Sequence, residues 1–354
     1  MGHVAGQYCY EINSFDHFSE FFPPGWHLEM TCGVALCTYN GEKYLEEQLA
    51  SILSQTRPPD EIVICDDCST DDTWNILNRF KLSTSVPVKL IRNAKQQGVT
   101  KNFELAVKSL ETDLIFLCDQ DDIWFPNKIS AIHAVFVASP NTQMVFTNAV
   151  LVDANGKDMG ATLFGELQLS REESQAIARG KAFEVLCRRN VITGATAAFR
   201  RSLISIAMPF SDTCLHDEWL GLIASTLGDV RQLTDSTIKY RQHGKNIVGV
   251  KKLSTLEILK ELWWSIHRFG SRKFSEDKIR YRMELLDRIK QYSAISRSFI
   301  EKCQDAVAFA EFRAALPQSF LVRWPVVILK AIKGEYRRFG YWWKSDIFRD
   351  LIHK

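Results

Sequence analysis

Two carboxylates separated by a single residue, Asp119 and Asp121, directly follow the apolar run Leu114–Cys118. If that run is a buried strand, both side chains leave its carboxyl end on one loop, where they can bind one hard divalent cation such as Mg2+ or Mn2+. A cation held there would bridge two phosphate groups of a ligand and neutralise their charge. The alternative is a solvated acidic turn ahead of Pro126, because such a pair is a weak signal by itself.

Polar residues follow two earlier apolar runs in the same way. Residues 38–40 come after Cys32–Cys37, and Asp66 and Asp67 come after Glu61–Cys65. In parallel sheets, ligands bind beyond the carboxyl ends of the strands, so the three clusters indicate one site. Asp66, the nearer to its strand, can accept the ring N–H of a uracil or thymine, although Asp is also frequent where a helix begins.

The elements that position these clusters alternate between strand and helix. Short apolar runs predict strands, and apolar residues three or four apart predict helices, with Ser69 and Asp72 capping the second helix. The alternation predicts an α/β fold with a mostly parallel, Rossmann-like sheet flanked by helices. We expect helices over residues 44–53, 69–80, 100–110 and 216–227, and strands at Cys32–Cys37, Glu61–Cys65, Val86–Ile91, Asp113–Cys118, Met144–Val152 and Val191–Phe199.

Length and charge exclude several classes of protein. The chain has 354 residues and a net charge of +2, too little positive charge for a general nucleic-acid binder. No apolar run approaches the roughly 18 to 20 residues that span a bilayer, and nine scattered cysteines suit a reducing cytoplasm. No Gly-rich loop follows the first two strands, which argues against a dinucleotide site or a P-loop. We divide the chain into an irregular extension (1–29), an α/β domain (30–250) and a helical C-terminal region (251–354).

Four motifs resemble, in order and spacing, those of family-2 glycosyltransferases of the GT-A fold. They are Ala35–Gly41, Cys65–Thr73, Gln97–Phe103 and Asp119–Trp124, and the resemblance covers about residues 31–250. It implies that the α/β domain is a catalytic domain that uses a nucleotide-diphosphate sugar as donor and a divalent cation, Mg2+ or Mn2+, as cofactor.

The resemblance also implies a role for individual residues on the donor side. These residues would hold the base (Thr38, Tyr39, Asp66), lie near the ribose (Gly98, Asn102), contact the ribose or diphosphate (Asp119, Gln120, Asp121, Arg241), contact the substrate beside them (Asn40), support these contacts (Asp67) or bind the cation (Asp119, Asp121, His243). Gly244 and Gly249 predict a loop that closes over the donor.

The acceptor side centres on residues 216–219, at the start of a predicted helix. An inverting transfer needs one base to take the proton from the acceptor hydroxyl as it attacks the anomeric carbon. The resemblance implies that Asp217 is this base. His216 stands where many family members carry Glu, so Glu218 is the alternative base, and an Asp at a helix start is otherwise a cap or dipole partner. Substrate contacts are also expected from Gly194, Glu218 and Trp219.

The complete set of motifs looks most like that of bacterial rhamnosyltransferase-type members. This implies transfer of rhamnose from dTDP-rhamnose to a glycan or lipid-linked glycan acceptor in cell-surface polysaccharide synthesis. The protein would then be cytoplasmic, with a peripheral position on the inner face of the cytoplasmic membrane as the further expectation. The alternatives are a sugar-1-phosphate nucleotidyltransferase, which would need a Gly-rich loop with a Lys after the first strand, and a catalytically silent donor-binding module.

The C-terminal end combines positive charge with aromatic residues. Residues 320–354 contain eight Lys or Arg against three Asp or Glu. This composition is typical of a helix on an anionic membrane surface, and the alternative is a helical cap that packs on the catalytic domain. The interleaved aromatic residues are Trp324, Tyr336, Phe339, Tyr341, Trp342 and Trp343.

Overall fold

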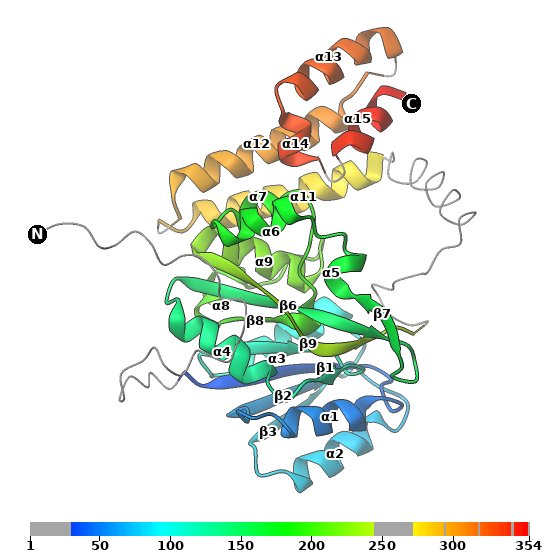
Figure 1. The fold of residues 1–354 in the computed structure, drawn as a ribbon, viewed down its shortest axis with the longest axis vertical. Coiled ribbons are helices and arrows are strands. Elements are labelled where there is room, and N and C mark those ends of the chain that lie inside the picture. The colour runs from blue at the N-terminus through cyan, green and yellow to red at the C-terminus, as the bar shows by residue number, and fades with distance from the viewer. Residues whose placement is uncertain (1–29, 244–271, 294, 318, 341–342, 353–354) are drawn as a thin grey trace, which may run out of the picture.

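The structure is a computed structural model that describes residues 30–243, 272–293, 295–317, 319–340 and 343–352 (Figure 1). The predicted N-terminal extension, the domain boundary at residue 250, and the loop glycines Gly244 and Gly249 lie outside these residues, as do Tyr341 and Trp342. None of the helices in the described ranges is long and apolar enough to cross a bilayer.

A mixed sheet forms the centre of the molecule. In the described residues its strand order is β3-β2-β1-β4-β8-β6-β9-β5, with β7 paired to β6. The β3-β2-β1-β4 half is parallel, β8 runs antiparallel between β4 and β6, and β6 pairs in parallel with β9. The strands are β1 (Cys32–Thr38), β2 (Glu61–Asp66), β3 (Val88–Arg92), β4 (Leu114–Cys118), β5 (Ile123–Trp124), β6 (Thr142–Val152), β7 (Asp158–Thr162), β8 (Ala197–Arg200) and β9 (Asp229–Arg241).

Helices cover both faces of this sheet, because alternate residues of a buried strand point into two different cores. Val34 and Leu36 of β1 pack with one set of helices, whereas Ala35 and Cys37 pack with the other. The first core contains residues of α1 (Leu45–Leu53), α2 (Thr73–Ser83) and α4 (Lys128–Ala138), and the second those of α3 (Val99–Lys108), α6 (Arg171–Ala178), α7 (Ala182–Leu186), α8 (Ile204–Ala207) and α9 (His216–Leu227). A short helix, α5 (Leu163–Glu166), follows β7.

Two local predictions are corrected by the structure. The second helix begins at Thr73 rather than Ser69, because the Ser69 hydroxyl bonds to Asp66 and Asp72 stands at the N-cap. The segment predicted as a strand from Val191 is extended only from Ala197, after a 3-10 turn over Gly194–Thr196. Backbone groups of that turn bond to distant side chains instead of to a neighbouring strand.

The C-terminal helices pack on the α/β domain through a shared core. Residues of α11 (Arg272–Lys290), α12 (Arg297–Ala314), α13 (Phe320–Ile332) and α14 (Glu335–Phe339) join the core that also contains α9. The last helix, α15 (Trp343–Ile352), packs against α13 and α14. Figure 1 shows α13 at one end of the long axis and α2 at the other. Tyr336 and Phe339 were expected among the interfacial aromatic residues, but both are buried, because they pack with Phe309 of α12.

Replacing Arg282 tests how much the packing of the C-terminal helices contributes to stability. Its guanidinium is buried and donates to the carbonyl oxygens of Ala306 in α12 and Cys187 after α7. We expect Arg282→Ala to remove both hydrogen bonds, leave a cavity in the shared core and lower the free energy of unfolding in urea by about 3 kcal/mol. Arg297→Ala is the control, since that side chain is 91% exposed, and its effect should stay below about 0.5 kcal/mol. Equal effects would contradict a structural role for Arg282.

Candidate active site

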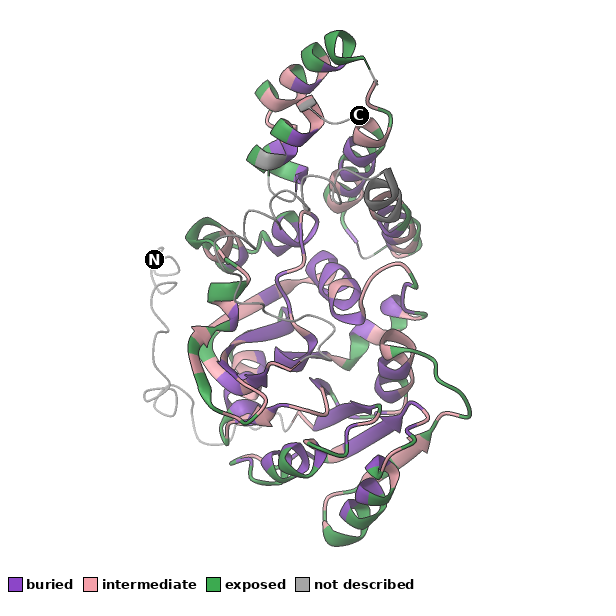
Figure 2. Ribbon diagram, turned by 90° about the vertical axis from the view of Figure 1, so that its right-hand side faces the viewer, coloured by how far each residue is buried: buried purple, intermediate pink, exposed green. Residues whose placement is uncertain are grey.

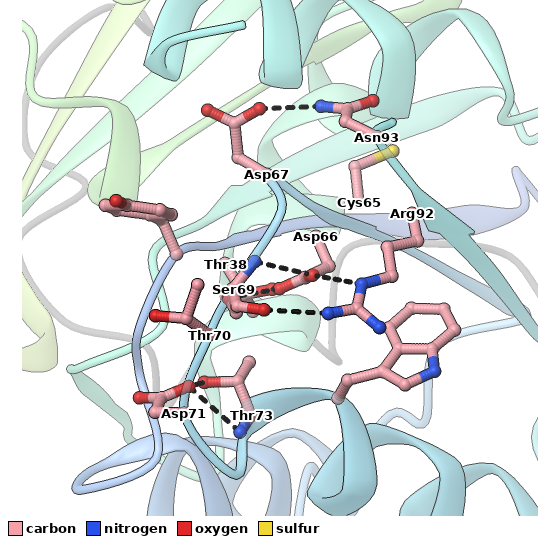
Figure 3. Close-up of polar contacts among 12 residues, drawn as sticks. Thr38, Cys65, Asp66, Asp67, Ser69, Thr70, Asp71, Thr73, Arg92 and Asn93 are labelled. Atoms are coloured by element: carbon pink, nitrogen blue, oxygen red, sulfur yellow. Dashed lines mark hydrogen bonds and ion pairs between the residues drawn. The ribbon is translucent and has the colours of Figure 1, made fainter. Parts of the chain in front are cut away.

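Asp66 lies at the centre of the contacts after β1 and β2 (Figure 3). Its buried carboxylate accepts hydrogen bonds from the Thr38 hydroxyl (3.0 Å) and the Ser69 backbone N–H (3.0 Å). The Arg92 guanidinium lies 3.4 Å away. The Ser69 hydroxyl also donates to the oxygen that Thr38 contacts. These contacts fix the carboxylate where two parallel strands end. Thr38 serves to hold Asp66 in place.

Asp67 organises the loop that follows β3. Its carboxylate accepts hydrogen bonds from the Asn93 side chain (2.8 Å) and from the backbone N–H groups of Gln97 (2.7 Å) and Gly98 (2.9 Å). Asn93 also donates to Asn102, whose amide in turn donates to the Cys65 carbonyl oxygen at 2.8 Å. Asp67 and Asn102, two predicted substrate ligands, are therefore the supports of this loop. Gly98 has φ +86° and open space at the Cβ position, so it remains accessible to a ligand.

Gln120 connects the loop that follows β1 to the loop that follows β4. We call the latter, residues 119–122, the acidic loop. Its side chain accepts from the Tyr39 N–H (2.8 Å) and donates to the Tyr39 carbonyl oxygen (3.0 Å). Asn40, with φ 48°, accepts from the Thr70 N–H at 2.9 Å. Tyr39 itself is 42% exposed, so its ring is available to stack on a base.

The acidic loop has partners for some of its carboxylates but not for all. Asp121 faces His243, with 2.7 Å between Oδ2 and Nε2, and Asp122 accepts from the Arg241 backbone N–H at 3.0 Å. The second oxygen of Asp122 is buried and has no hydrogen-bond partner among the described residues. Burial and then the charges of Asp121 and Asp119 raise the pKa of Asp122 well above its usual range. No hydrogen bond from a described residue reaches the Asp119 carboxylate.

Arg241 is more engaged than the sequence implies. Its buried guanidinium donates to the Asp121 carbonyl oxygen (2.8 Å) and pairs with Glu47 of α1. It also lies over the Tyr44 ring, which stacks on His243. These contacts join the acidic loop to α1, so Arg241 holds its neighbours in position.

Lys128 is a buried cation at this site that the sequence interpretation missed. Its ammonium group donates to the Ala195 carbonyl oxygen at 2.6 Å and lies 3.7 Å from the centroid of the Trp124 ring. Burial lowers its pKa to about 8, against the opposing effects of Cys118, Asp122 and Asp119. The signal in the sequence is the spacing of Trp124 and Lys128, four residues apart directly after the acidic loop.

Asp217 is held at the start of α9 by groups from another segment. Its buried carboxylate accepts hydrogen bonds from the Gly194 N–H (2.9 Å) and the Asn190 side chain (3.1 Å). Burial raises its pKa to about 6, although these hydrogen bonds lower it. Asp217 lies close enough to the acidic loop that its charge, after burial and Asp121, helps to raise the pKa of Asp119 to about 7. No pattern in the sequence indicates Asn190.

The neighbours of Asp217 point away from the acidic loop. Glu218 faces Lys278 and Arg282 of α11, and burial raises its pKa against the opposing charge of Lys278. Trp219 is fully buried and donates to the Ala207 carbonyl oxygen at 2.7 Å, so it belongs to the core. His216 stacks on Phe103 with 4.0 Å between ring centroids, and burial lowers its pKa to about 3. Of the three predicted residues after His216, Asp217 alone is turned toward the acidic loop.

The residues present fit a divalent cation that takes part of its coordination from a ligand. Within the described ranges, no group of three or more His, Cys, Asp and Glu side chains is arranged to hold a metal ion. Asp121 and His243 are adjacent, however, and Asp119 has free oxygen lone pairs nearby. Magnesium-type sites commonly use one or two carboxylates together with phosphate oxygens. The donor set therefore suits a cation bound jointly with a diphosphate.

Comparison with known proteins assigns this domain. Residues 33–205 match Glycosyl transferase family 2. This part of the chain belongs to that family. The dTDP-rhamnosyl transferase RfbG of Shigella flexneri is 29% identical over 240 residues, or 65% of this chain and 80% of that protein. The UDP-Glc:alpha-D-GlcNAc-diphosphoundecaprenol beta-1,3-glucosyltransferase WfaP of Escherichia coli is 37% identical over 97 residues, which span 27% of this chain and 38% of that protein.

A solved structure agrees with the family assignment at the level of the fold. The mannosyltransferase PcManGT of Pyrobaculum calidifontis, in complex with GDP-Man and Mn2+, superimposes with a TM-score of 0.51 at 16% identity. The match covers 91% of this chain and 86% of that one. The predicted GT-A fold with a helical C-terminal region is confirmed, and the chain carries a glycosyltransferase domain.

Gly41 tests whether the Gln120 bridge shapes the donor site. A Cβ at position 41 would lie 2.2 Å from Gln120 Oε1, so Gly41→Ala must break the two hydrogen bonds to Tyr39. We expect a loss of about 1–2 kcal/mol in unfolding free energy and roughly tenfold weaker nucleotide binding by calorimetry. In Gly41→Ala/Gln120→Ala the overlap is removed, so the double variant should lose less than the sum of the two single variants. Additive losses would exclude this contact as the cause.

Proposed function

We propose that this domain transfers a sugar, with inversion, from a nucleotide-diphosphate donor to an acceptor hydroxyl, and that Asp217 is the base. The observation that carries the proposal is the placement of Asp217. Its carboxylate is buried, held by Gly194 and Asn190, and close enough to Asp119 for their charges to interact. A base of raised pKa beside a diphosphate-binding loop has the arrangement that acceptor activation requires.

The donor would lie along the edge where β1, β2 and β4 end. Asp66 and the exposed Tyr39 ring would bind the base, with Asn40 beside them, and Gly98 would approach the ribose. Asp119 would contact the ribose or diphosphate, while Asp121 and His243 would hold a divalent cation, Mg2+ or Mn2+, that neutralises the phosphates. Asp67, Asn102, Gln120 and Arg241 would position these groups through the contacts described above.

The chemical step needs one proton transfer and one displacement. Asp217 would take the proton of the acceptor hydroxyl as its oxygen forms a bond to the anomeric carbon. The bond from that carbon to the phosphate oxygen breaks on the opposite side, and the nucleoside diphosphate leaves. Lys128 and the backbone around Gly194 would hold the base and the acidic loop at a fixed separation, which avoids reorganisation during the step.

The donor we infer is dTDP-rhamnose, and the acceptor is a glycan or a lipid-linked glycan in surface polysaccharide synthesis. The similarity to the Shigella flexneri dTDP-rhamnosyl transferase supports this donor. The similarity to a glucosyltransferase named for a diphosphoundecaprenol acceptor supports a lipid-linked acceptor. Such an acceptor implies a cytoplasmic protein on the inner face of the cytoplasmic membrane. A thermal-shift panel of nucleotide sugars should give the largest stabilisation with dTDP-rhamnose; equal shifts with all donors would contradict this choice.

A sugar-1-phosphate nucleotidyltransferase remains the second candidate from the sequence. Its expected Gly-rich loop with a Lys is absent after the first strand, and the family match favours glycosyl transfer. Release of free diphosphate from a nucleoside triphosphate would identify that activity instead.

The pH dependence of transfer tests the base. Because burial places the pKa of Asp217 at about 6, the ionised base is lost as the pH falls below that value, and kcat/KM should decline tenfold per pH unit. Asp217→Asn should lower kcat by about 10²- to 10⁴-fold at pH 7.5. Glu218→Gln is the matched control and should retain the pH profile. The reverse pattern would make Glu218 the base.

Cation binding tests the pair at the acidic loop. Asp121→Asn and His243→Ala each remove one proposed ligand, so we expect Mn2+ affinity in the presence of the nucleoside diphosphate to fall about 10- to 100-fold. Electron paramagnetic resonance of free Mn2+ measures this directly and needs no turnover. Asp229→Asn, on the β9 strand where Asp229 pairs with Arg231, is the control. Unchanged affinity in both ligand variants would remove these residues from the cation site.

A further inference from the structure

The outward face of α13 is apolar. Leu321, Pro325, Ile328 and Ile332 are spaced so that they fall on one side of the helix. Leu321 is 81% exposed and Ile332 is 79% exposed, values unusual for large aliphatic side chains. Figure 2 colours much of this helix as exposed, at the end of the molecule opposite α2 in Figure 1. We call these four residues the α13 stripe.

The opposite side of α13 carries the polar contacts that fix its orientation. Arg323 is 5% exposed and donates to the Leu351 carbonyl oxygen of α15 at 3.1 Å. Lys330 pairs with Glu335 at 2.7 Å. Val327, which lies between Arg323 and Lys330 in the sequence, is fully buried. Surface helices normally bury their apolar side and expose their charges. Rotating α13 to bury the stripe would expose Val327 and break both polar contacts.

The apolar surface extends beyond the stripe. Phe320, Val322, Trp324 and Leu329 of α13 are each about half exposed, and α15 exposes Trp343 and Phe348. Exposed apolar groups gathered on one element mark an interaction site more often than scattered ones do. Two tryptophans at the edge of such a surface suit an environment that is apolar on one side and wet on the other.

The charges around this surface indicate its partner. The three acidic residues of α14 and α15 are all engaged within the helices: Glu335 with Lys330, Asp350 with Arg313, and Asp346 with Arg313 and Arg349. Among the described residues after Ile332, the exposed cations are Lys333, Arg337, Arg338 and Lys344. Arg337 faces Glu172 at 3.6 Å and Arg338 faces Asp305 at 3.7 Å, which leaves Lys333 and Lys344 as the outward charges. An apolar face flanked by positive charge complements an anionic lipid bilayer, whose interior is apolar and whose headgroups are negatively charged.

We propose that the α13 stripe inserts into the headgroup region of an anionic lipid bilayer and anchors the protein to it. At 13 residues, α13 is about 20 Å long, shorter than the ~30 Å hydrocarbon core, so it lies in the plane of the interface. Lys333 and Lys344 contact the lipid phosphates. The anchor deepens the proposed function, in which the acceptor is lipid-linked, but it rests on residues outside the active site.

Vesicle flotation of the full chain tests the proposal. The protein should float with vesicles of phosphatidylcholine and phosphatidylglycerol, float less with phosphatidylcholine alone, and detach as salt increases. Leu321→Ser/Ile332→Ser should weaken binding at least about tenfold, since each side chain loses apolar surface available for insertion. Lys333→Glu/Lys344→Glu should remove the preference for the anionic lipid. All four side chains are exposed, so thermal unfolding should remain that of the wild type.

Leu82→Ser is the matched control, because Leu82 is 88% exposed on α2 at the other end of the molecule. It should bind vesicles like the wild type. Asp217→Asn should also bind normally, so failure of the proposed function and failure of the anchor are distinguishable. Flotation by the Leu321→Ser/Ile332→Ser variant equal to wild type, or no flotation of the wild type, overturns the proposal. A concentration-dependent dimer that this variant abolishes, without vesicle binding, would assign the face to a second copy instead.

Discussion

The parallel register of β1 with both of its neighbours brings negative charge together at one edge of the sheet. Thr38 aligns with Asp66 on one side, and Leu36 aligns with Cys118 on the other. The loops that leave these strands therefore start at the same edge of the sheet, with about 5 Å between adjacent strands, and they carry Asp66, Asp67 and the three aspartates of residues 119–122. Burial and the charges of neighbouring carboxylates raise the pKa of Asp119 and of Asp122. Hydrogen-bond donors and the buried ammonium group of Lys128 lie among these carboxylates.

The hydrogen bonds divide these carboxylates into two kinds: those that hold the backbone in place and those that remain open to a ligand. Asp66 and Asp67 each accept several hydrogen bonds, from Thr38, Ser69 and the β3–α3 loop, and so fix the backbone around them. Lys128 supplies a buried positive charge behind the acidic loop. Asp119 receives no hydrogen bond from the described residues, which leaves its lone pairs for a ligand. A site that binds a diphosphate and a cation needs both kinds of carboxylate, because only a rigid frame keeps the available ones apart.

The C-terminal helices serve two surfaces at once. On their inner side, α11 donates from Arg282, Lys278 and Arg288 to backbone carbonyls of the catalytic domain, which makes the two regions share one core. On the outer side, α13 presents aliphatic residues to solvent while its arginine is buried. The sequence interpretation offered a helical cap and a membrane-surface helix as alternatives. The packing shows the cap in α11 and α12, and it leaves α13 with the features on which the anchor is proposed.

The sequence by itself determined the strand and helix order as far as β4, the four motifs and the start of α9 at His216, because these depend on local periodicity and on residue types at short spacing. It also predicted which loops would carry the chemistry. Only the tertiary structure decided which partner each side chain takes: Arg241 binds Glu47, nearly 200 residues away, Glu218 turns to α11, Trp219 enters the core and Lys128 reaches the Gly194 turn. The orientation of α13 was decided in the same way. The spacing of apolar residues in the sequence fixes which face of a helix is apolar. Whether that face is buried depends on which distant residues contact the opposite face of the helix.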